Sequence, residues 1–241
     1  MRKITILAFA IAATLQACDP QTIQSVLSSV PSAASVPLTN EEVIAGLKEA
    51  LEVGTNSAVS FTSKMDGFNK NQLIRIPFPE EAQKVKDWAI SNGLKSQVDA
   101  FEDNLNRAAE KAAAEAAPIF INAITNMSIQ DGFNILKGDS TAATVYLRNA
   151  TQAQLYEKFA PIIQNKIDEV KLTSYWEPIT KAYNTASIFT GNAQVNTDLK
   201  DYATNKALDG LFFYVAKEEK NIRQNPAARV TDLLKKVFSQ Q

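Results

Sequence analysis

The sequence predicts an all-α fold: a single multi-helix domain of about eight helices, with one short β element as an open option, behind a lipidated flexible tether. Three observations support this prediction. From Thr39 onward, apolar residues recur at spacings of three and four, which is the period of one face of a helix. Hydrophobic residues make up 45% of the chain, enough for one sizeable core. No period of about 20 to 50 residues repeats, so no repeat architecture is indicated.

The first residues have the form of a bacterial export signal. Arg2 and Lys3 give a short positive region, and an apolar stretch of signal-peptide length follows over residues 4–15. The next four residues, Leu15-Gln16-Ala17-Cys18, resemble a lipobox, whose cysteine becomes the acylated first residue of the mature protein. We therefore expect residues 1–17 to be a lipoprotein signal peptide and Cys18 to be the lipidation site. The alternative is an ordinary cleaved signal, with Cys18 as an incidental thiol.

Residues 18–38 are expected to be the lipidated cysteine and a flexible tether, because they carry three prolines, many serines and a single charge. The helical domain of unknown function then covers residues 39–241. Through acylated Cys18 the chain would bind the lipid bilayer, and its body would face the periplasm of a bacterial cell envelope. Asp19 fits the rule by which enterobacteria keep lipoproteins at the inner membrane. That rule does not extend to all bacteria, so the inner and the outer membrane both stay open.

The first helix of the body is expected to start at Thr39, because Thr39 and Glu42 have the spacing of a capping box. Gly54 lies on its apolar stripe, where we expect close packing. Pro118 and Pro161 each either kink a helix or start a new one. Residues Leu73 to Ile76 alternate as a short edge strand would. Further helices are expected over residues 79–93, 98–118, 128–138, 141–148, 152–170, 175–186, 199–221 and, after Asn225-Pro226, up to 238.

The composition excludes several kinds of functional site. Without histidine there is no imidazole general base, no catalytic triad and no imidazole metal ligand, and one cysteine excludes a disulfide framework or a multi-thiolate metal site. The 25 basic residues against 26 acidic ones argue against nucleic-acid binding. The sequence has no glycine-rich phosphate loop, no Gly-x-Ser-x-Gly elbow and no metal motif. We therefore expect no metal, no cofactor and no nucleic-acid partner.

The helix expected over 199–221 carries the first group of candidate polar residues. Five bulky residues, Leu211 to Val215, predict a helix that is buried on most sides. The apolar stripe continues towards Glu218 or Glu219, and a buried carboxylate needs a partner because an unpaired buried charge is too costly. Arg223 lies four residues after Glu219, the spacing of a helix ion pair. Three interpretations remain open: a partly solvated helix end, a buried ion pair, or an active-site carboxylate.

A second group of polar residues lies in the helix expected over 98–118. Asp103 and Arg107 are four residues apart and Arg107 and Glu110 are three apart, with Asn104 and Asn106 beside them. These spacings predict a ladder of ion pairs on a solvated helix face. Arginine is scarcer than lysine in this chain and better suited to bidentate or buried pairing, which makes Arg107 a residue to follow.

Short stretches spread over nearly the whole body carry a family resemblance. They are Leu47-Lys48-Glu49-Ala50-Leu51, Ile74-Arg75-Ile76-Pro77-Phe78-Pro79, Asn106-Arg107-Ala108-Ala109-Glu110, Ala117-Pro118-Ile119-Phe120, Ala142-Ala143-Thr144, Leu208-Asp209-Gly210-Leu211-Phe212, Glu218-Glu219-Lys220-Asn221-Ile222-Arg223 and, through Asn225-Pro226, Leu233-Leu234-Lys235-Lys236-Val237-Phe238. On these residues the body, from about Glu42 to Phe238, resembles the bacterial family known as domain of unknown function 4197. The resemblance implies a helical fold and an envelope location, and it brings no activity or catalytic residue. It also places Arg107, Glu110, Asp209, Glu219 and Arg223 within the family's motifs.

We expect a membrane-anchored envelope lipoprotein whose helical body binds a small amphiphilic, lipid-like ligand or an envelope protein, with no catalysis. A groove between helices can hold an acyl chain or a partner helix. One alternative is a hydrolase that uses carboxylates and arginine, which requires convergence in one pocket. The other is a purely structural envelope component. The candidate binding residues or buried polar network, whether a site or a structural set of ion pairs, are Arg107, Glu110, Asp209, Glu218, Glu219 and Arg223.

Overall fold

The computed structural model describes residues 38–169, 198–229 and 231–238, with the separate positions 181, 184, 185, 188, 189 and 194. The chain from Leu38 onward forms one compact unit. The described residues contain no β-strand, which agrees with the predicted all-α, single-domain fold. The predicted signal peptide, Cys18, the tether up to residue 37 and most of the helix expected over 175–186 lie outside the described residues.

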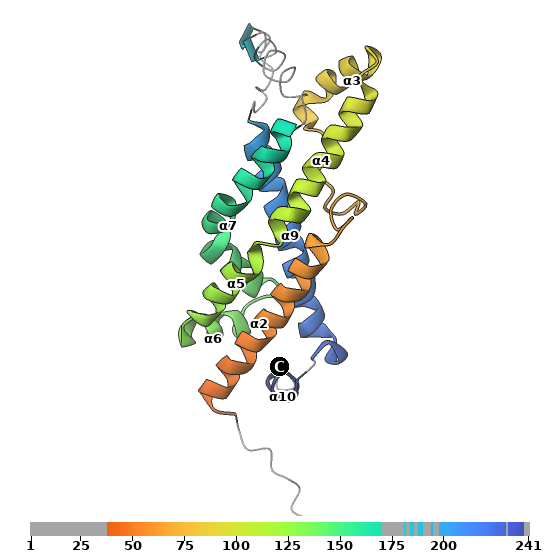
Figure 1. Cartoon of the computed structure of the whole chain (residues 1–241). Helices are drawn as coiled ribbons and strands as arrows, with labels where there is room; N and C mark the ends of the chain where they lie inside the picture. The colour runs from red at the N-terminus through yellow and green to blue at the C-terminus, as the bar shows by residue number, and fades with distance from the viewer. Residues whose placement is uncertain are drawn as a thin grey trace, which may run out of the picture. The chain divides into compact units, whose positions relative to one another are not determined.

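Long helices packed side by side make up the body (Figure 1). The central one, α9, packs against α2, α4 and α7, so the core lies between these four helices. The shorter α5 and α6 cover α2 and α7, and α10 packs on α2. The elements are α2 (Asn40–Ser63), α3 (Gln83–Ser91), α4 (Lys95–Ala113), α5 (Ala116–Thr125), α6 (Ile129–Lys137), α7 (Ala142–Glu169), α9 (Leu199–Gln224) and α10 (Asp232–Phe238), with 3-10 turns η1 (Glu80–Ala82) and η2 (Pro226–Ala228).

The start of α2 is fixed by the predicted capping box. The Thr39 hydroxyl accepts a hydrogen bond from the Glu42 amide at 3.1 Å, and the Glu42 carboxylate accepts one from the Thr39 amide at 2.8 Å. Each bond satisfies an amide that the first turn of a helix would otherwise leave free. The sequence prediction of this helix start is therefore confirmed.

The bulky run in α9 is buried on most sides, as its sequence predicts. Leu208, Leu211 and Phe212 are each at most 1% exposed, because α2, α4 and α7 surround this part of the helix. Phe213 is the exception, with 43% of its surface exposed. It lies on the one face of α9 that reaches solvent.

The two helices expected over 141–148 and 152–170 form one continuous helix, α7, so the predicted boundary between them is wrong. The residues between them do not interrupt a helix, and the buried Thr151 hydroxyl donates back to the Leu147 carbonyl at 2.6 Å. Pro161 lies inside α7. Pro118, in contrast, falls in the first turn of α5, where a missing amide costs nothing.

The strand expected over Leu73 to Ile76 does not form. The amide and the carbonyl of Ile76 bond to the side-chain amide of Asn106 on α4, at 2.8 and 2.9 Å. An asparagine side chain therefore satisfies the backbone groups that a strand would pair with a neighbouring strand. The alternation in the sequence has another cause: Ile74 and Ile76 point into the core while Leu73 is exposed.

The loop that follows α2 is packed tightly onto α9. Phe68 is fully buried, and a Cβ placed on Gly210 would lie 2.5 Å from its Cε1 atom. Only glycine at this position of α9 lets the ring approach so closely. Within the described residues, no helix is both long and apolar enough to cross a membrane.

Candidate functional site

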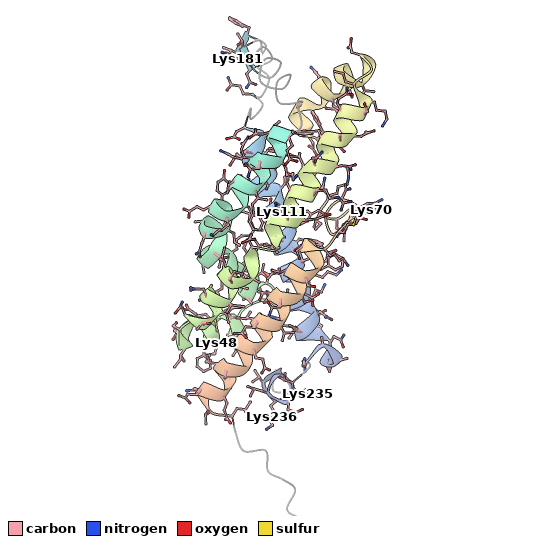
Figure 2. The ribbon with its side chains drawn as sticks, viewed as in Figure 1. Lys48, Lys70, Lys111, Lys181, Lys235 and Lys236 are labelled. Carbon is pink, nitrogen blue, oxygen red and sulfur yellow. The ribbon has the colours of Figure 1, made fainter. Side chains whose placement is uncertain are left out.

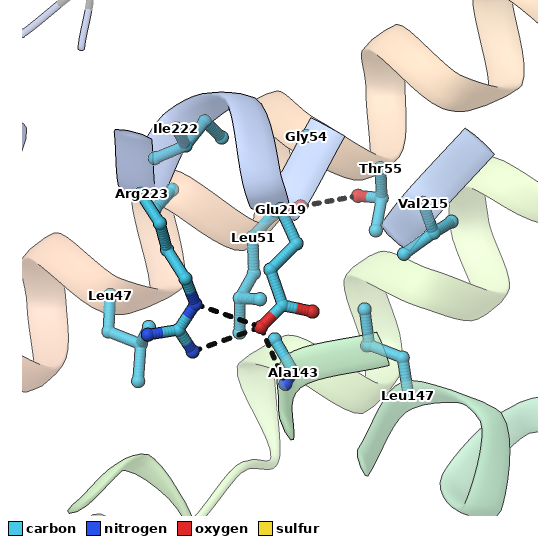
Figure 3. A pocket seen from close by; sticks show the side chains of 11 residues that line it. Leu47, Leu51, Gly54, Thr55, Ala143, Leu147, Val215, Glu219, Ile222 and Arg223 are labelled. Atoms are coloured by element: carbon cyan, nitrogen blue, oxygen red, sulfur yellow. Dashed lines mark hydrogen bonds and ion pairs between the residues drawn. The ribbon is translucent and has the colours of Figure 1, made fainter. Parts of the chain in front are cut away.

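A small cavity opens between α2, α7 and α9 (Figure 3). Its volume is about 30 Å³, and it is partly open to solvent. Leu47 and Leu51 of α2, Leu147 of α7 and Val215 and Ile222 of α9 give it an apolar wall. Ala50, Gly54, Thr55, Ala143, Glu219 and Arg223 complete the lining.

Glu219 of α9 caps the N-terminus of α7 from outside that helix. Its Oε1 accepts from the Ala143 amide at 3.0 Å, and its Oε2 accepts from the amide and the hydroxyl of Thr144 at 2.9 and 2.8 Å. Ala143 and Thr144 belong to the first turn of α7, whose amides have no partner inside the helix. The positive end of the helix dipole favours a carboxylate at this place.

Arg223 binds the same carboxylate. Its Nε and Nη2 donate to Glu219 Oε1 at 3.1 and 2.9 Å, and Nη2 also donates to the Ile135 carbonyl at 3.0 Å. Both side chains are largely buried, so of the three interpretations left open by the sequence, the structure shows the buried ion pair. Among the described residues, no acceptor is recorded for Arg223 Nη1. In Figure 3 this third nitrogen points away from Glu219, on the side of the guanidinium where Leu47 is drawn.

The Glu219 carboxylate is saturated with donors. Three hydrogen bonds reach Oε1 and two reach Oε2, more than the roughly four lone pairs of a carboxylate accept comfortably. Such a group has no free lone pair with which to attack a substrate. The other polar side chain of the wall, Thr55, donates its hydroxyl to the Leu51 carbonyl at 2.7 Å. The surface that the cavity exposes is almost entirely apolar, and Arg223 Nη1 is the nitrogen of its lining for which no acceptor is recorded among the described residues.

Arg107 and Glu110 belong to a separate cluster on α4. Glu110 Oε1 accepts from the amides of Phe68 and Asn69, each at 3.1 Å, and Oε2 accepts from Arg107 at 2.8 Å. Arg107 also donates to Asp66 at 2.6 Å. The Arg107–Glu110 pair agrees with the predicted spacing, and hydrogen bonds to Glu110 and Asp66 raise the pKa of Arg107.

The predicted pair between Asp103 and Arg107 is wrong. Arg107 turns instead to Asp66, 41 positions away in the chain, and the recorded ion pair of Asp103 is with Arg75 at 4.0 Å. Glu110 is buried, so this part of α4 is not the solvated ladder that its spacing predicts.

Three buried polar residues on α4, four positions apart, hold the segment between α2 and α3. Glu110 binds its beginning at Phe68, Asn106 binds the backbone of Ile76, and Glu102 binds the Arg75 and Lys86 side chains at 2.8 and 2.6 Å. Burial would raise the pKa of Glu102, but the hydrogen bonds from Lys86 and Arg75 bring it below its ordinary value. Glu102 was not among the residues expected from the sequence, although its four-residue spacing from Asn106, and that of Asn106 from Glu110, is visible there.

The remaining candidates lie elsewhere on α9. Asp209 is exposed and accepts from Arg148 of α7 at 3.0 Å. Glu218 is half-buried, and its Cβ is 3.7 Å from where a Cβ on Gly54 would stand. The ion pairs of Asp209, of Arg107 with Glu110 and of Glu219 with Arg223 share no residue. The geometry therefore does not bring the six candidates together in one catalytic pocket, and the described residues contain no group of carboxylates arranged to hold a metal ion.

Comparison with known proteins gives a family and no function. A family model described as "Protein of unknown function (DUF4197)" matches residues 37–239, which include every described helix. Neither the curated proteins nor the solved structures give a match to the chain.

Proposed function

We propose that this chain, which belongs to the DUF4197 family, is a lipid-anchored envelope protein whose helical body binds a small amphiphilic ligand and performs no catalysis. One observation carries the proposal: the cavity between α2, α7 and α9 combines an apolar wall with Arg223 Nη1, whose two N–H groups have no recorded acceptor among the described residues. An apolar pocket with a few placed polar groups is the usual form of a small-molecule site.

The size of the cavity limits the ligand to a short apolar group. A volume of about 30 Å³ has room for roughly two water molecules. The site therefore suits the end of an acyl chain or a short branched group, with the rest of the ligand lying in the opening. Leu51, Leu147 and Val215 would contact the apolar part.

The charge of the site favours an uncharged acceptor. Glu219 already neutralises Arg223, so the pair as a whole carries no net charge. A carboxylate ligand would meet Glu219 at close range and gain little from Arg223, whereas an ester or amide carbonyl oxygen accepts from Nη1 without that repulsion. We therefore assign the polar part of the ligand to an ester or amide oxygen.

The binding site can be tested with two small probes that share the same four-carbon acyl chain. Monobutyrin, a neutral ester, and butyrate, its charged counterpart, are offered to the full-length chain, and saturation-transfer NMR measures their contact with the protein. We expect contact with monobutyrin to exceed that with butyrate at least tenfold. Equal signals for the two probes would contradict the assignment.

Two leucine substitutions on α2 provide the matched control for that experiment. Gly54→Leu places a side chain in the cavity, and Asn56→Leu places the same side chain on the exposed face of the helix. Monobutyrin contact should be lost in Gly54→Leu and kept in Asn56→Leu. Retention in both variants would place the ligand somewhere other than this cavity.

The anchor is tested separately, at Cys18. The lipobox-like residues 15–18 support acylation, and several acyl chains hold a protein stably at a bilayer. We expect Cys18→Ser to release the chain from the membrane fraction without lowering the melting temperature of the body. A variant that still partitions into the detergent phase as the unaltered chain does would contradict the lipoprotein assignment.

A further inference from the structure

We infer that the loop after α2, together with the adjoining face of α9, docks onto anionic lipid head groups. This surface is distinct from the ligand cavity, which lies further along α2 and α9. We call it the basic loop surface. It consists of Lys64, Met65, Lys70, Leu73, Phe213 and Lys217.

Its apolar side chains are unusually exposed. Met65 is 78% exposed, Leu73 65% and Phe213 43%, while most large apolar residues of the described body are buried. Exposed apolar residues gathered on one surface commonly mark an interaction site. Figure 1 shows the loop between α2 and α3 projecting from the packed helices.

Aromatic contacts join the loop to α9. Phe61, in the last turn of α2, stacks on Tyr214 with ring centroids 4.2 Å apart, and Tyr214 meets Phe213 edge-on at 5.6 Å. The Asn71 side chain donates to the Tyr214 hydroxyl at 2.7 Å. The loop and this face of α9 therefore present one continuous surface.

The charges around these apolar residues are mainly positive. Lys64 lies 3.9 Å from the centre of the Phe61 ring and Lys217 lies 5.2 Å from that of Tyr214, and no ion pair is recorded for either lysine among the described residues. Lys70, marked in Figure 2, is 76% exposed and contacts Asp66, which Arg107 also neutralises. Half-buried Glu218 is a nearby acidic group, and exposed Asp209, one turn before Phe213 on the same face of α9, is paired with Arg148. Helix α2 carries no charged residue from Val53 to Ser63. Lysines around exposed apolar groups are complementary to an anionic bilayer surface.

The loop is held rigid enough to act as a preformed surface. Glu110 binds the amides of Phe68 and Asn69, Asn106 binds Ile76, and Phe68 is buried against Gly210. Docking then requires little ordering of the backbone, which lowers its entropic cost.

The expected lipid anchor is long enough to allow this contact, and in this step the inference rests on the proposed function. The 20 residues that follow Cys18 up to Leu38 span at most about 70 Å when extended. The 24 residues of α2 separate the end of that tether from the loop by about 36 Å. An anchored chain can therefore bring the basic loop surface to the same bilayer, where the tether keeps the local lipid concentration high.

An environment-sensitive fluorophore tests the docking. The full-length chain carrying Met65→Cys is labelled with a nitrobenzoxadiazole group and placed in vesicles of phosphatidylcholine alone or of phosphatidylethanolamine and phosphatidylglycerol. Acylated Cys18 has no thiol to label, and a mass measurement checks that each chain carries one label. Val145→Cys on α7, at a side chain with 53% exposure, is the matched control.

We expect the Met65 label to shift to shorter wavelength and gain intensity only in anionic vesicles, and the Val145 label to stay unchanged. Lys64→Gln, Lys70→Gln and Lys217→Gln together should remove the shift, since each lysine near an anionic surface strengthens binding about fivefold. The same emission at Met65 in both kinds of vesicle would overturn the inference. An emission shift of the Met65 label that appears in detergent and grows with protein concentration would also overturn the inference. A second copy of the protein would then cover the surface.

Vesicle flotation tests the lipid anchor at Cys18 separately from the docking of the basic loop surface. A chain that floats with both kinds of vesicle but shows no Met65 shift keeps the anchor and loses the docking surface. A chain that floats only with anionic vesicles and shows the shift supports the docking surface and contradicts the anchor. A chain that floats with neither contradicts both.

Discussion

The amide and the hydroxyl of Thr144 both donate to one carboxylate oxygen of Glu219, at 2.9 and 2.8 Å, across 75 positions of the chain. One side chain of α9 thereby completes the first turn of α7. The same carboxylate holds Arg223 against the cavity. Helix capping, helix packing and the polar end of the proposed ligand site thus depend on a single residue.

Removing this carboxylate should destabilise the body strongly. Glu219→Ala leaves two amides of α7 without an acceptor and the largely buried Arg223 without its charged partner, with only the Ile135 carbonyl to accept from it, so we expect the free energy of unfolding to fall by about 3–5 kcal/mol. Glu219→Gln should lower the free energy of unfolding less, because the glutamine side chain still has one carbonyl oxygen that accepts hydrogen bonds. Urea unfolding measures both, and Glu218→Ala, one position away, is the control with a small expected effect.

The ion pair itself should be replaceable. In Glu219→Leu with Arg223→Met, no buried charge is left unpaired, so the double variant should be more stable than Glu219→Leu alone. A double variant that loses the sum of the two single losses would show that the charges of Glu219 and Arg223 do not interact energetically.

Asn106 should be the most sensitive polar position in the α4 row. It is fully buried and makes three hydrogen bonds, to both backbone groups of Ile76 and to the Glu102 carbonyl. Asn106→Ala leaves the buried amide and carbonyl of Ile76 unpaired, at a cost of about 2–4 kcal/mol. Asn104→Ala, which removes an exposed contact with its own helix, should change the free energy of unfolding by less than about 0.5 kcal/mol.

Acid should weaken the attachment between α4 and the segment before α3. Burial opposes ionisation of Glu102, but hydrogen bonds from Lys86 and Arg75 give it a lowered pKa in the folded state. The unfolded chain then binds more protons over this range, so the stabilisation is full above the ordinary pKa of 4.5 and is lost as pH falls through the lower folded pKa. Asp66 acts in the same direction, because hydrogen bonds from Lys70 and Arg107 lower its pKa.

Urea unfolding between pH 7 and pH 3 checks this dependence. Glu102→Gln should flatten the decline in stability below about pH 4.5, since glutamine does not titrate. An unchanged slope in that variant would mean that Glu102 makes no contribution to the acid sensitivity.

Gly54 separates stability from ligand binding. A Cβ at this position would lie 3.4 Å from Ile222 Cδ1, an ordinary contact, and alanine is a better helix former than glycine by about 1 kcal/mol. Gly54→Ala should therefore raise the melting temperature while narrowing the cavity and weakening monobutyrin binding. A lower melting temperature would show that the close packing expected from the sequence leaves no room for a methyl group.

Local patterns were enough to predict the parts of the fold that depend on neighbouring residues. The capping box of Thr39 and Glu42 and the helix pair of Glu219 and Arg223 each join residues three or four apart, and both form. Pairing at such spacing depends on helix geometry alone.

Contacts between distant segments explain the errors. Arg107 binds Asp66 and not its predicted partner Asp103. The backbone of Ile76 bonds to the Asn106 side chain and not to a neighbouring strand. Three of the five donors to the Glu219 carboxylate come from two residues of α7. The sequence could not predict them, because they depend on how α7 packs against α9. Because these partners lie far apart in the sequence, the candidate residues fall into separate clusters.

We propose that the cavity beside Glu219 and Arg223 holds a ligand, and the ligand can be detected directly. Native mass spectrometry of the full-length chain, released from the membranes of the cells that produce it, measures the share of molecules with an added lipid mass. We predict an adduct of an uncharged ester or amide lipid on the unaltered chain and on Asn56→Leu, and a bare mass for Gly54→Leu. The same adduct on all three chains, or a bare mass on all three, would contradict a ligand in this cavity.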